Sequence, residues 1–269
     1  MMPHGFLEPE RLKISRAKKL LIGALVERKN LNSAAGIVAT SDAEATGFVR
    51  YGLKRPVHVM PIGIDFEKYG SRGGAAECSP SAARKRLLYF SRITPVKGLD
   101  LLAEAWRRLA SFHAAWELLI VGPDDRGYSK VVEALFERLS PDGSVHFVAP
   151  VYGDSKYALL NSADAFVLPT RSENWGIAVA EAMASGLPIV CTKGAPWKCI
   201  ETCGCGYWVD VSVAGICDGL SKVLSSADSV RMAMGQRGMA WVRDNLCWDR
   251  IADGVIGFYE KLLGIGSRG

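Results

Sequence analysis

The chain of 269 residues lacks the features that mark several protein classes. No uninterrupted apolar run approaches about 18 residues, so the sequence predicts no membrane-spanning helix. The start, Met1 to Gly5, is not followed by an apolar core segment, so no secretory signal peptide is expected. Internal repeats and low-complexity tracts are absent, and a content of 49% hydrophobic and 23% charged residues excludes a disordered or coiled-coil chain. The sequence therefore predicts a folded chain of one large domain or two ordinary ones.

The charge imbalance is small and confined to the front of the chain. The net charge is +5, and the first 60 residues carry the whole excess of basic residues. A cluster of these lies around one helix-like stretch near 11–29, namely Lys13, Arg16, Lys18, Lys19, Arg28 and Lys29. Such a stretch is either a solvated helix face or a contact with an anionic membrane surface. Because aromatic residues do not interleave with these cations, we expect no nucleic-acid partner.

The seven cysteines are odd in number and gather late in the chain. This pattern favours reduced thiols in a cytoplasmic protein over a disulfide framework. Cys199, Cys203 and Cys205 lie close together in the sequence, but no second pair stands out to complete a four-ligand zinc site. We therefore expect no metal.

Short apolar runs alternate with helical patterns along most of the chain, after a Gly/Ser/Pro-containing segment at 70–86 that is typical of a linker. Runs as short and continuously apolar as these are typical of strands buried on both faces. The predicted strands are 87–91, 116–122, 145–149, 165–168, 188–191 and 207–211. The predicted helices are 99–110, 128–139, 154–162, 176–185, 213–224, 228–245 and 248–263. This alternation predicts an α/β fold with a parallel sheet and helices on both of its faces.

The front section gives a shorter pattern of the same kind. It predicts helix 10–30, strand 36–39, helix 42–51 and strand 57–60. Ser41 and Glu44 have the spacing of a capping box at the start of the second helix. Two such units are too few to close a doubly wound sheet, so this section has the pattern of the last part of a larger domain.

Small and charged residues follow the predicted strands, and the ligand of an open α/β sheet binds at that edge. Arg92 and Lys97 follow the first strand of the back section, where a guanidinium and an ammonium suit a diphosphate. The alternative is two solvated surface cations.

Two glutamates eight positions apart mark a second candidate site. If the helix starts near Asn174, Glu173 lies at its mouth and Glu181 about two turns in. Free N–H groups at Trp175, Gly176 and Ile177 would add an anion site at the helix N-terminus. The alternative is that Glu173 caps the helix and Glu181 lies on its solvated face. Because the surroundings of Glu181 are apolar or small, the sequence favours the first interpretation.

Several of these segments together resemble a known family. They are Arg92 with Lys97-Gly98, Val121-Gly122-Pro123, and above all the run from Ser172 to Pro188, SENWGIAVAEAMASGLP. The run resembles the Glu-x7-Glu signature of glycosyltransferase family 4, whose members are retaining enzymes of the GT-B fold. The segments 192–197 and 204–210 are similar to those of bacterial members that build exopolysaccharide or lipopolysaccharide. The resemblance covers about 85–264 continuously and extends weakly into 1–69.

The resemblance implies a role for each candidate residue. Arg92 and Lys97 would bind the donor diphosphate, Glu181 the ribose hydroxyls, and Glu173 with the Asn174–Gly176 backbone the transferred sugar. Backbone near Phe147–Val151 would read the nucleobase. The implied donor site comprises Arg92, Lys97, Gly122, Val148, Val151, Glu173, Asn174, Trp175, Gly176, Ile177 and Glu181, with Glu173, Arg92 and Lys97 as the catalytic group.

The resemblance also implies the chemistry of the reaction. Family members generally need no metal, and this sequence has no Asp-x-Asp motif. We therefore expect no cofactor, and two cations with a helix end in place of a metal at the leaving phosphate. Because retention in the family is often ascribed to same-face attack, no protein nucleophile is assigned.

The predicted organisation is a remnant of an N-terminal acceptor-side domain at 1–69, a linker at 70–86, and a donor-binding domain with crossover helices at 87–269. The predicted function is transfer of a hexose from a nucleotide diphosphate sugar to a glycan or lipid-linked acceptor in bacterial surface polysaccharide synthesis. The expected location is the cytoplasm, with peripheral membrane contact through the stretch near 11–29. The alternatives are a non-catalytic or partner-dependent nucleotide-sugar-binding fragment, and a sugar-nucleotide epimerase or phosphorylase of the same fold.

Overall fold

The structure, a computed structural model, describes residues 1–2, 28–69 and 84–264. The chain forms two compact units, one of Ile64–Asn245 and one that joins Met1–Gly63 to Leu246–Gly269. The predicted helix 10–30 and the predicted linker 70–86 lie almost wholly outside the described residues. Compact units need not coincide with functional domains, so the domain boundaries expected from the sequence stay a prediction.

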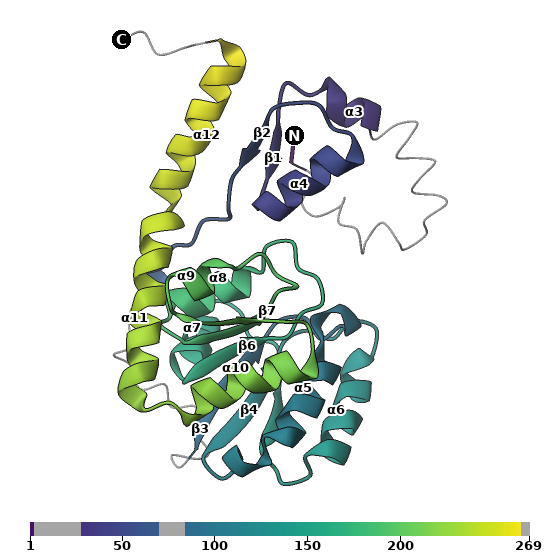
Figure 1. The fold of residues 1–269 in the computed structure, drawn as a ribbon, viewed down its shortest axis with the longest axis vertical. Coiled ribbons are helices and arrows are strands. Elements are labelled where there is room, and N and C mark those ends of the chain that lie inside the picture. Colours follow the sequence, from purple (N-terminus) through teal and green to yellow (C-terminus); the bar gives the residue numbers. More distant parts are fainter. Residues whose placement is uncertain (3–27, 70–83, 265–269) are drawn as a thin grey trace. The chain divides into compact units, whose positions relative to one another are not determined.

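The larger unit is built on a six-stranded parallel sheet (Figure 1). Its strands run in the spatial order β5-β4-β3-β6-β7-β8. They are β3 (Lys85–Phe90), β4 (Trp116–Val121), β5 (Val145–Val148), β6 (Ala165–Leu168), β7 (Ile189–Thr192) and β8 (Gly206–Val209). Every residue of β4, β6 and β7 is buried, which is why these strands appear in the sequence as runs that are apolar except at Glu117 and Thr192. All six predicted strands are confirmed to within two residues at either end.

Helices connect these strands. They are α5 (Leu99–Arg108), α6 (Tyr128–Leu139), α7 (Asp154–Asn161), α8 (Ile177–Ala184), α9 (Cys199–Thr202), α10 (Val213–Ser225) and α11 (Asp228–Asn245). Short 3₁₀ turns occur at η2 (Phe66–Lys68), η3 (Pro95–Lys97) and η4 (Ala110–Phe112). α5 contacts both α6 and α10 in one layer, whereas α8 contacts α11 (Figure 1). The predicted α/β fold is thereby confirmed, while the sequence did not predict α9 or the 3₁₀ turns.

The strand order reverses beside β3. The chain steps from β3 outward through β4 to β5, and then returns to the other side of β3 to step outward through β6, β7 and β8. The segments that leave β3 and β6 therefore emerge next to each other at the carboxyl edge of the sheet. Ligands of doubly wound sheets bind at this kind of switch point.

The smaller unit contains a two-stranded parallel sheet of β1 (Ile37–Ala39) and β2 (Val57–Val59). Its helices are α3 (Arg28–Ser33), α4 (Asp42–Tyr51) and α12 (Trp248–Leu263). Its core consists of Leu31, Ile37, Ala39, Phe48 and Leu53. The expected N-cap of α4 is confirmed, because the Ser41 hydroxyl accepts a hydrogen bond from the Glu44 amide. Among the described residues, no helix is both long and apolar enough to cross a bilayer.

Candidate functional site

Lys97 and Glu173 meet at the switch point of the large sheet. Lys97 ends the 3₁₀ turn after β3, and Glu173 lies in the loop between β6 and α8. The Lys97 ammonium donates a hydrogen bond to Oε2 of Glu173, across 76 positions of sequence. The two side chains are only 6% and 18% exposed. The structure thus brings together one cation and one carboxylate that the sequence assigned to the same site.

The turn that carries Lys97 is fixed to the loop after β6 by several hydrogen bonds. The Arg171 amide and the Thr170 hydroxyl both donate to the Val96 carbonyl, at 2.8 and 3.2 Å. The Arg171 guanidinium donates to the Pro95 carbonyl and to both oxygens of Asp100. The hydrogen bond from Arg171 holds the pKa of Asp100 below its ordinary value. These contacts fix the position of the turn that carries Lys97.

Gly98 allows the two loops to approach this closely. Its φ of +70° lies in the left-handed region, which favours glycine. A Cβ at this position would lie 2.0 Å from the Pro169 carbonyl oxygen, so no larger residue fits between the loops.

Arg92 lies in the same loop but is exposed. Its carbonyl accepts a hydrogen bond of 2.7 Å from the Tyr89 hydroxyl. Burial raises the pKa of Tyr89, and the nearby charges of Glu173 and Arg92 act on it in opposite directions. The Tyr89 hydroxyl thus contacts the Arg92 backbone at the carboxyl edge of β3, and the loop that carries Glu173 leaves the neighbouring strand β6 at the same edge.

Gly122 contacts the loop that carries Arg92. A Cβ on Gly122 would lie 1.9 Å from the Ser91 carbonyl oxygen, so the backbones are in direct contact. The Ile93 amide donates to the Pro123 carbonyl at 2.9 Å and ties the two loops together. Val148 and Val151 lie farther out, at the carboxyl end of the edge strand β5, with Val148 39% exposed.

The start of α8 differs from the one used to place Glu181. The helix begins at Ile177, three residues after the predicted start near Asn174, because Gly176 is its N-cap with a φ of +83°. Glu181 therefore lies just over one turn into the helix, and not two. The Val179 amide already bonds the Gly176 carbonyl, so the helical amides left for an anion are those of Ile177 and Ala178.

Glu181 is buried and has two partners. The Tyr69 hydroxyl and the Lys156 ammonium both donate to its Oε1, at 3.0 and 2.7 Å. Glu181 is only 7% exposed, so the alternative of a solvated helix face is wrong. No described residue donates a hydrogen bond to Oε2, which leaves that oxygen for a ligand.

Sequence reasoning missed Lys156 and Tyr69. Lys156 lies in the first turn of α7, and its ammonium also lies over the rings of Tyr69 and Tyr157, at 5.7 and 5.1 Å from their centroids. Burial, followed by the charge of Glu181, raises the pKa of Tyr69. One signal for Lys156 was present in the sequence, namely its position in the first turn of the helix that follows β5, on the same edge of the sheet as the other candidates.

The segment before α8 is closely packed. A Cβ on Gly176 would lie 3.0 Å from Cγ of Glu173, so the glutamate side chain folds over the helix start. Trp175 is buried, its carbonyl accepts a hydrogen bond from the Trp197 indole, and its own indole N–H has no partner among the described residues. Ile177 is 38% exposed, and Asn174 is half-buried. Glu173, Asn174, Trp175, Gly176 and Ile177 therefore all lie at one helix end.

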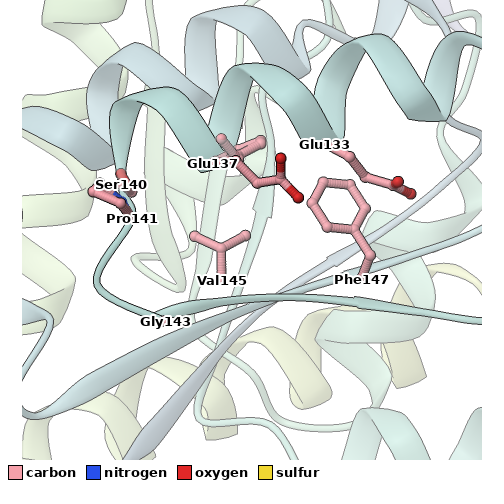
Figure 2. A pocket seen from close by; sticks show the side chains of 8 residues that line it. Glu133, Glu137, Ser140, Pro141, Gly143, Val145 and Phe147 are labelled. Atoms are coloured by element: carbon pink, nitrogen blue, oxygen red, sulfur yellow. The ribbon is translucent and has the colours of Figure 1, made fainter.

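A separate groove of about 540 Å³ lies between α6 and β5 (Figure 2). The carboxylates of Glu133 and Glu137 line it on either side of the Phe147 ring in this view. Apart from Phe147, which begins the segment expected to read a base, it contains no residue predicted for the site.

The described residues contain no group of three or more His, Cys, Asp or Glu side chains that could hold a metal ion. The cysteines of the described ranges are free thiols, including Cys199, Cys203 and Cys205. A hydrogen bond from Cys205 lowers the pKa of Cys203 below its ordinary value.

The model of the family described as glycosyl transferases group 1 matches residues 79–241, which include β3 through β8 and most of α11. The chain belongs to this family. The matched region contains Arg92, Lys97, Glu173 and Glu181.

Beyond the match to the family model, the chain is similar to curated relatives and to solved structures over most of its length. The chain is 28% identical over 242 residues to a D-inositol 3-phosphate glycosyltransferase of Segniliparus rotundus, covering 86% of this chain and 53% of that protein. It is 27% identical over 218 residues to a GDP-mannose:cellobiosyl-diphosphopolyprenol alpha-mannosyltransferase of Xanthomonas campestris, covering 81% and 53%. The structure of HepE from Anabaena with UDP and glucose matches with a TM-score of 0.74 at 18% identity, covering 96% and 70%. The chain thus spans about half the length of these curated relatives.

Proposed function

We propose that this chain binds a nucleotide diphosphate sugar and acts in retaining transfer of its hexose to a glycan or lipid-linked acceptor. The observation that carries the proposal is the meeting of Lys97 and Glu173 at the switch point, beside Arg92 and the start of α8. Family membership supports the same conclusion independently.

The donor diphosphate would bind Arg92, Lys97 and the amides of Ile177 and Ala178. Exposed Arg92 offers a planar fork of donors, while buried Lys97 offers a point charge. The first turn of α8 adds amides and the positive end of a helix dipole. These groups together would stabilise the negative charge that develops on the leaving phosphate.

The two carboxylates would hold the uncharged parts of the donor. Oε2 of Glu181 is open to ribose hydroxyls, while Tyr69 and Lys156 fix the side chain through Oε1. Glu173, at the helix start, would accept hydrogen bonds from the transferred sugar, with the backbone of Asn174–Gly176. In this arrangement Val148 and Val151 would lie against the base. No side chain is assigned as nucleophile and no metal is assigned to the reaction.

The named substrates of the relatives support the proposed substrate classes. The Xanthomonas campestris relative is named for GDP-mannose and a cellobiosyl-diphosphopolyprenol acceptor, which supports a hexose donor, a lipid-linked acceptor and a role in bacterial surface polysaccharide, exopolysaccharide or lipopolysaccharide. The HepE structure contains UDP and glucose, so we infer either a uridine or a guanosine donor. A lipid-linked acceptor favours a cytoplasmic protein with peripheral membrane contact through the basic stretch near 11–29.

Calorimetric titration with UDP, GDP and ADP tests the proposed donor site. We expect one of the three to bind the wild type, and Arg92→Ala to weaken that binding about tenfold, since a charged hydrogen bond contributes about 1.5 kcal/mol. Arg243→Ala, which removes an exposed cation on α11, is the matched control and should change the affinity less than about twofold. Equal affinity of Arg92→Ala and wild type, or no binding of any of the three, would remove the proposed site.

A further inference from the structure

The smaller unit contains a hollow of about 720 Å³ surrounded by cations. It is lined by Arg28, Lys29, Asn32, Gly52, Lys54 and Arg55. Gly52 to Arg55 lead into β2, so the hollow lies at the amino edge of the β1-β2 sheet. Substrates of α/β sheets bind at the carboxyl edge, so this hollow differs in position from a site of that kind.

Asn32 fixes the two segments that form the hollow. Its side-chain amide donates to the Gly52 carbonyl at 3.3 Å and to the Arg28 carbonyl at 2.9 Å. Its Oδ1 accepts from the Lys54 amide at 2.9 Å, and its own carbonyl accepts from Nε of Arg55. These bonds hold Lys54 and Arg55 next to Arg28 on α3. The network therefore fixes the backbone at Arg28 and Lys54 and the side chain of Arg55.

The four cations have no carboxylate to neutralise them within the part of the chain that the structure describes. No ion pair there involves Arg28, Lys29, Lys54 or Arg55. The Arg28 guanidinium lies over the Tyr51 ring, 5.2 Å from its centroid, which orients it without removing its charge.

Between Arg28 and Val59, a range that the structure describes throughout, the acidic residues are Asp42 and Glu44. Asp42 and Glu44 are in the first turn of α4, at the opposite end of that helix from Gly52. Glu44 is already used by Thr40, whose amide and hydroxyl both donate to its Oε2. Like charges held this close repel one another, and an anion in the hollow would relieve that repulsion.

We propose that this hollow binds a phosphate group. Two guanidinium forks and two ammonium groups match a tetrahedral, doubly charged anion better than a single carboxylate. A phospholipid headgroup and a free phosphorylated solute share this chemistry. All the lining residues belong to the smaller unit and none of them is a proposed donor-site residue, so the site goes beyond the proposed function and does not depend on it.

A nitrogen–proton NMR titration with inorganic phosphate at low ionic strength tests the site, because salt would screen it. We expect saturable shifts at the amides of Gly52, Leu53 and Lys54. The double variant Lys54→Gln/Arg55→Gln should weaken this binding about tenfold or more, since each cation near an anionic group contributes about a factor of five. Both side chains are exposed, so the variant is expected to keep its fold, which its spectrum reports directly.

The control is Lys222→Gln/Arg243→Gln, which removes the same charge from exposed positions on α10 and α11. It should bind phosphate at the hollow as the wild type does. Shifts confined to the loop Ile93–Gly98 would report the donor site alone and would count against the hollow.

Sedimentation with vesicles distinguishes the source of the phosphate. The vesicles are phosphatidylcholine alone, and phosphatidylcholine with phosphatidylglycerol. Binding only to the anionic vesicles that is lost in Lys54→Gln/Arg55→Gln, and not in the control, assigns a lipid headgroup. Amide shifts with phosphate but no such vesicle dependence assign a free solute. If neither the amides near Gly52 nor vesicle binding respond to the double variant, the proposal is wrong.

Discussion

Glu173 and Glu181 are both paired with a lysine, yet they differ in what the pairing leaves free. Glu173 lies in a loop, and its partner Lys97 is itself a proposed ligand of the diphosphate. Glu181 lies inside α8, and its partners Lys156 and Tyr69 both bind one oxygen and leave the other open. The first pair would have to rearrange or share its lysine when a donor binds, whereas the second is already arranged for hydroxyl groups. Donor binding would thus change the hydrogen bond between Lys97 and Glu173, whereas the partners of Glu181 already leave its Oε2 open.

Among the substitutions that test this difference, Lys97→Met should have the largest effect on nucleoside diphosphate affinity. The substitution removes a phosphate ligand and leaves the Glu173 carboxylate unneutralised beside the diphosphate. We expect the affinity for the bound nucleoside diphosphate to fall roughly a hundredfold, about 3 kcal/mol, by calorimetry. Lys193→Met removes an exposed lysine that pairs with Asp210 and is the control, with a change under about threefold. Similar losses in both variants would contradict a specific role of Lys97.

Glu181→Gln and Glu173→Gln separate the two carboxylates. Glu181→Gln should weaken nucleoside diphosphate binding about tenfold, because an amide is a poorer acceptor for ribose hydroxyls than a carboxylate. Glu173→Gln should leave that affinity within about threefold, because it also releases Lys97 toward the phosphates.

The 2′,3′-dideoxy nucleotide sharpens this test. It should bind wild type and Glu181→Gln equally, since it lacks the hydroxyls that Oε2 would accept. A tenfold loss that persists with the dideoxy nucleotide would place the contact of Glu181 elsewhere than on the ribose.

Arg171→Leu tests how the Lys97 turn is held in place. The substitution removes the bonds from Arg171 to Asp100 and Pro95, so we expect the free energy of unfolding at pH 7 to fall by about 1 kcal/mol. Because the pKa of Asp100 is lowered in the folded state, this contribution is complete above about pH 4 and disappears as the pH falls below that value. Urea denaturation of both proteins at pH 7 and pH 3 measures the difference.

The control for that measurement is Arg107→Leu, which removes an exposed partner of Glu104 on α5. Its effect on the free energy of unfolding should stay within the error of the measurement, because solvent screens a surface pair. A loss that is the same at pH 3 and pH 7 in Arg171→Leu would show that the pair with Asp100 contributes nothing.

Lys156→Met should give the smallest effect. Tyr69 still donates to Oε1 of Glu181, so we expect nucleoside diphosphate affinity to change only about twofold to threefold. Tyr69→Phe combined with Lys156→Met should lose more nucleoside diphosphate affinity than the sum of the two single losses, because the first substitution leaves the second donor to fix Glu181. Strictly additive losses would indicate that the two donors do not share the task of fixing Glu181.

The elements of the large sheet could be predicted because burial on both faces leaves a direct mark on the sequence. β6 and β7 consist only of buried residues, so their apolar runs are unmistakable. Their spatial order could not be predicted, because nothing in an apolar run specifies its neighbour. The predicted helix 176–185 agrees with α8 to within one residue, but the start near Asn174 used to place Glu181 was too early, because the left-handed conformation of Gly176, which the sequence allows but does not require, ends the loop there.

The residues of the candidate site could also be predicted only in part. The residue types of Arg92, Lys97, Glu173 and Glu181, together with the strands they follow, were enough to name them. Lys156 and Tyr69 could not be named, since each becomes relevant only by a contact with Glu181 across 25 and 112 positions of sequence. Long-range partners of a buried charge are set by packing, which leaves no local pattern.

The most direct test of the account is a crystal structure of the chain with the nucleoside diphosphate that binds in calorimetry. We predict the diphosphate within hydrogen-bond distance of Arg92 and Lys97, and a ribose hydroxyl on Oε2 of Glu181. A nucleotide bound in the groove between α6 and β5, or anywhere away from these three side chains, would contradict it.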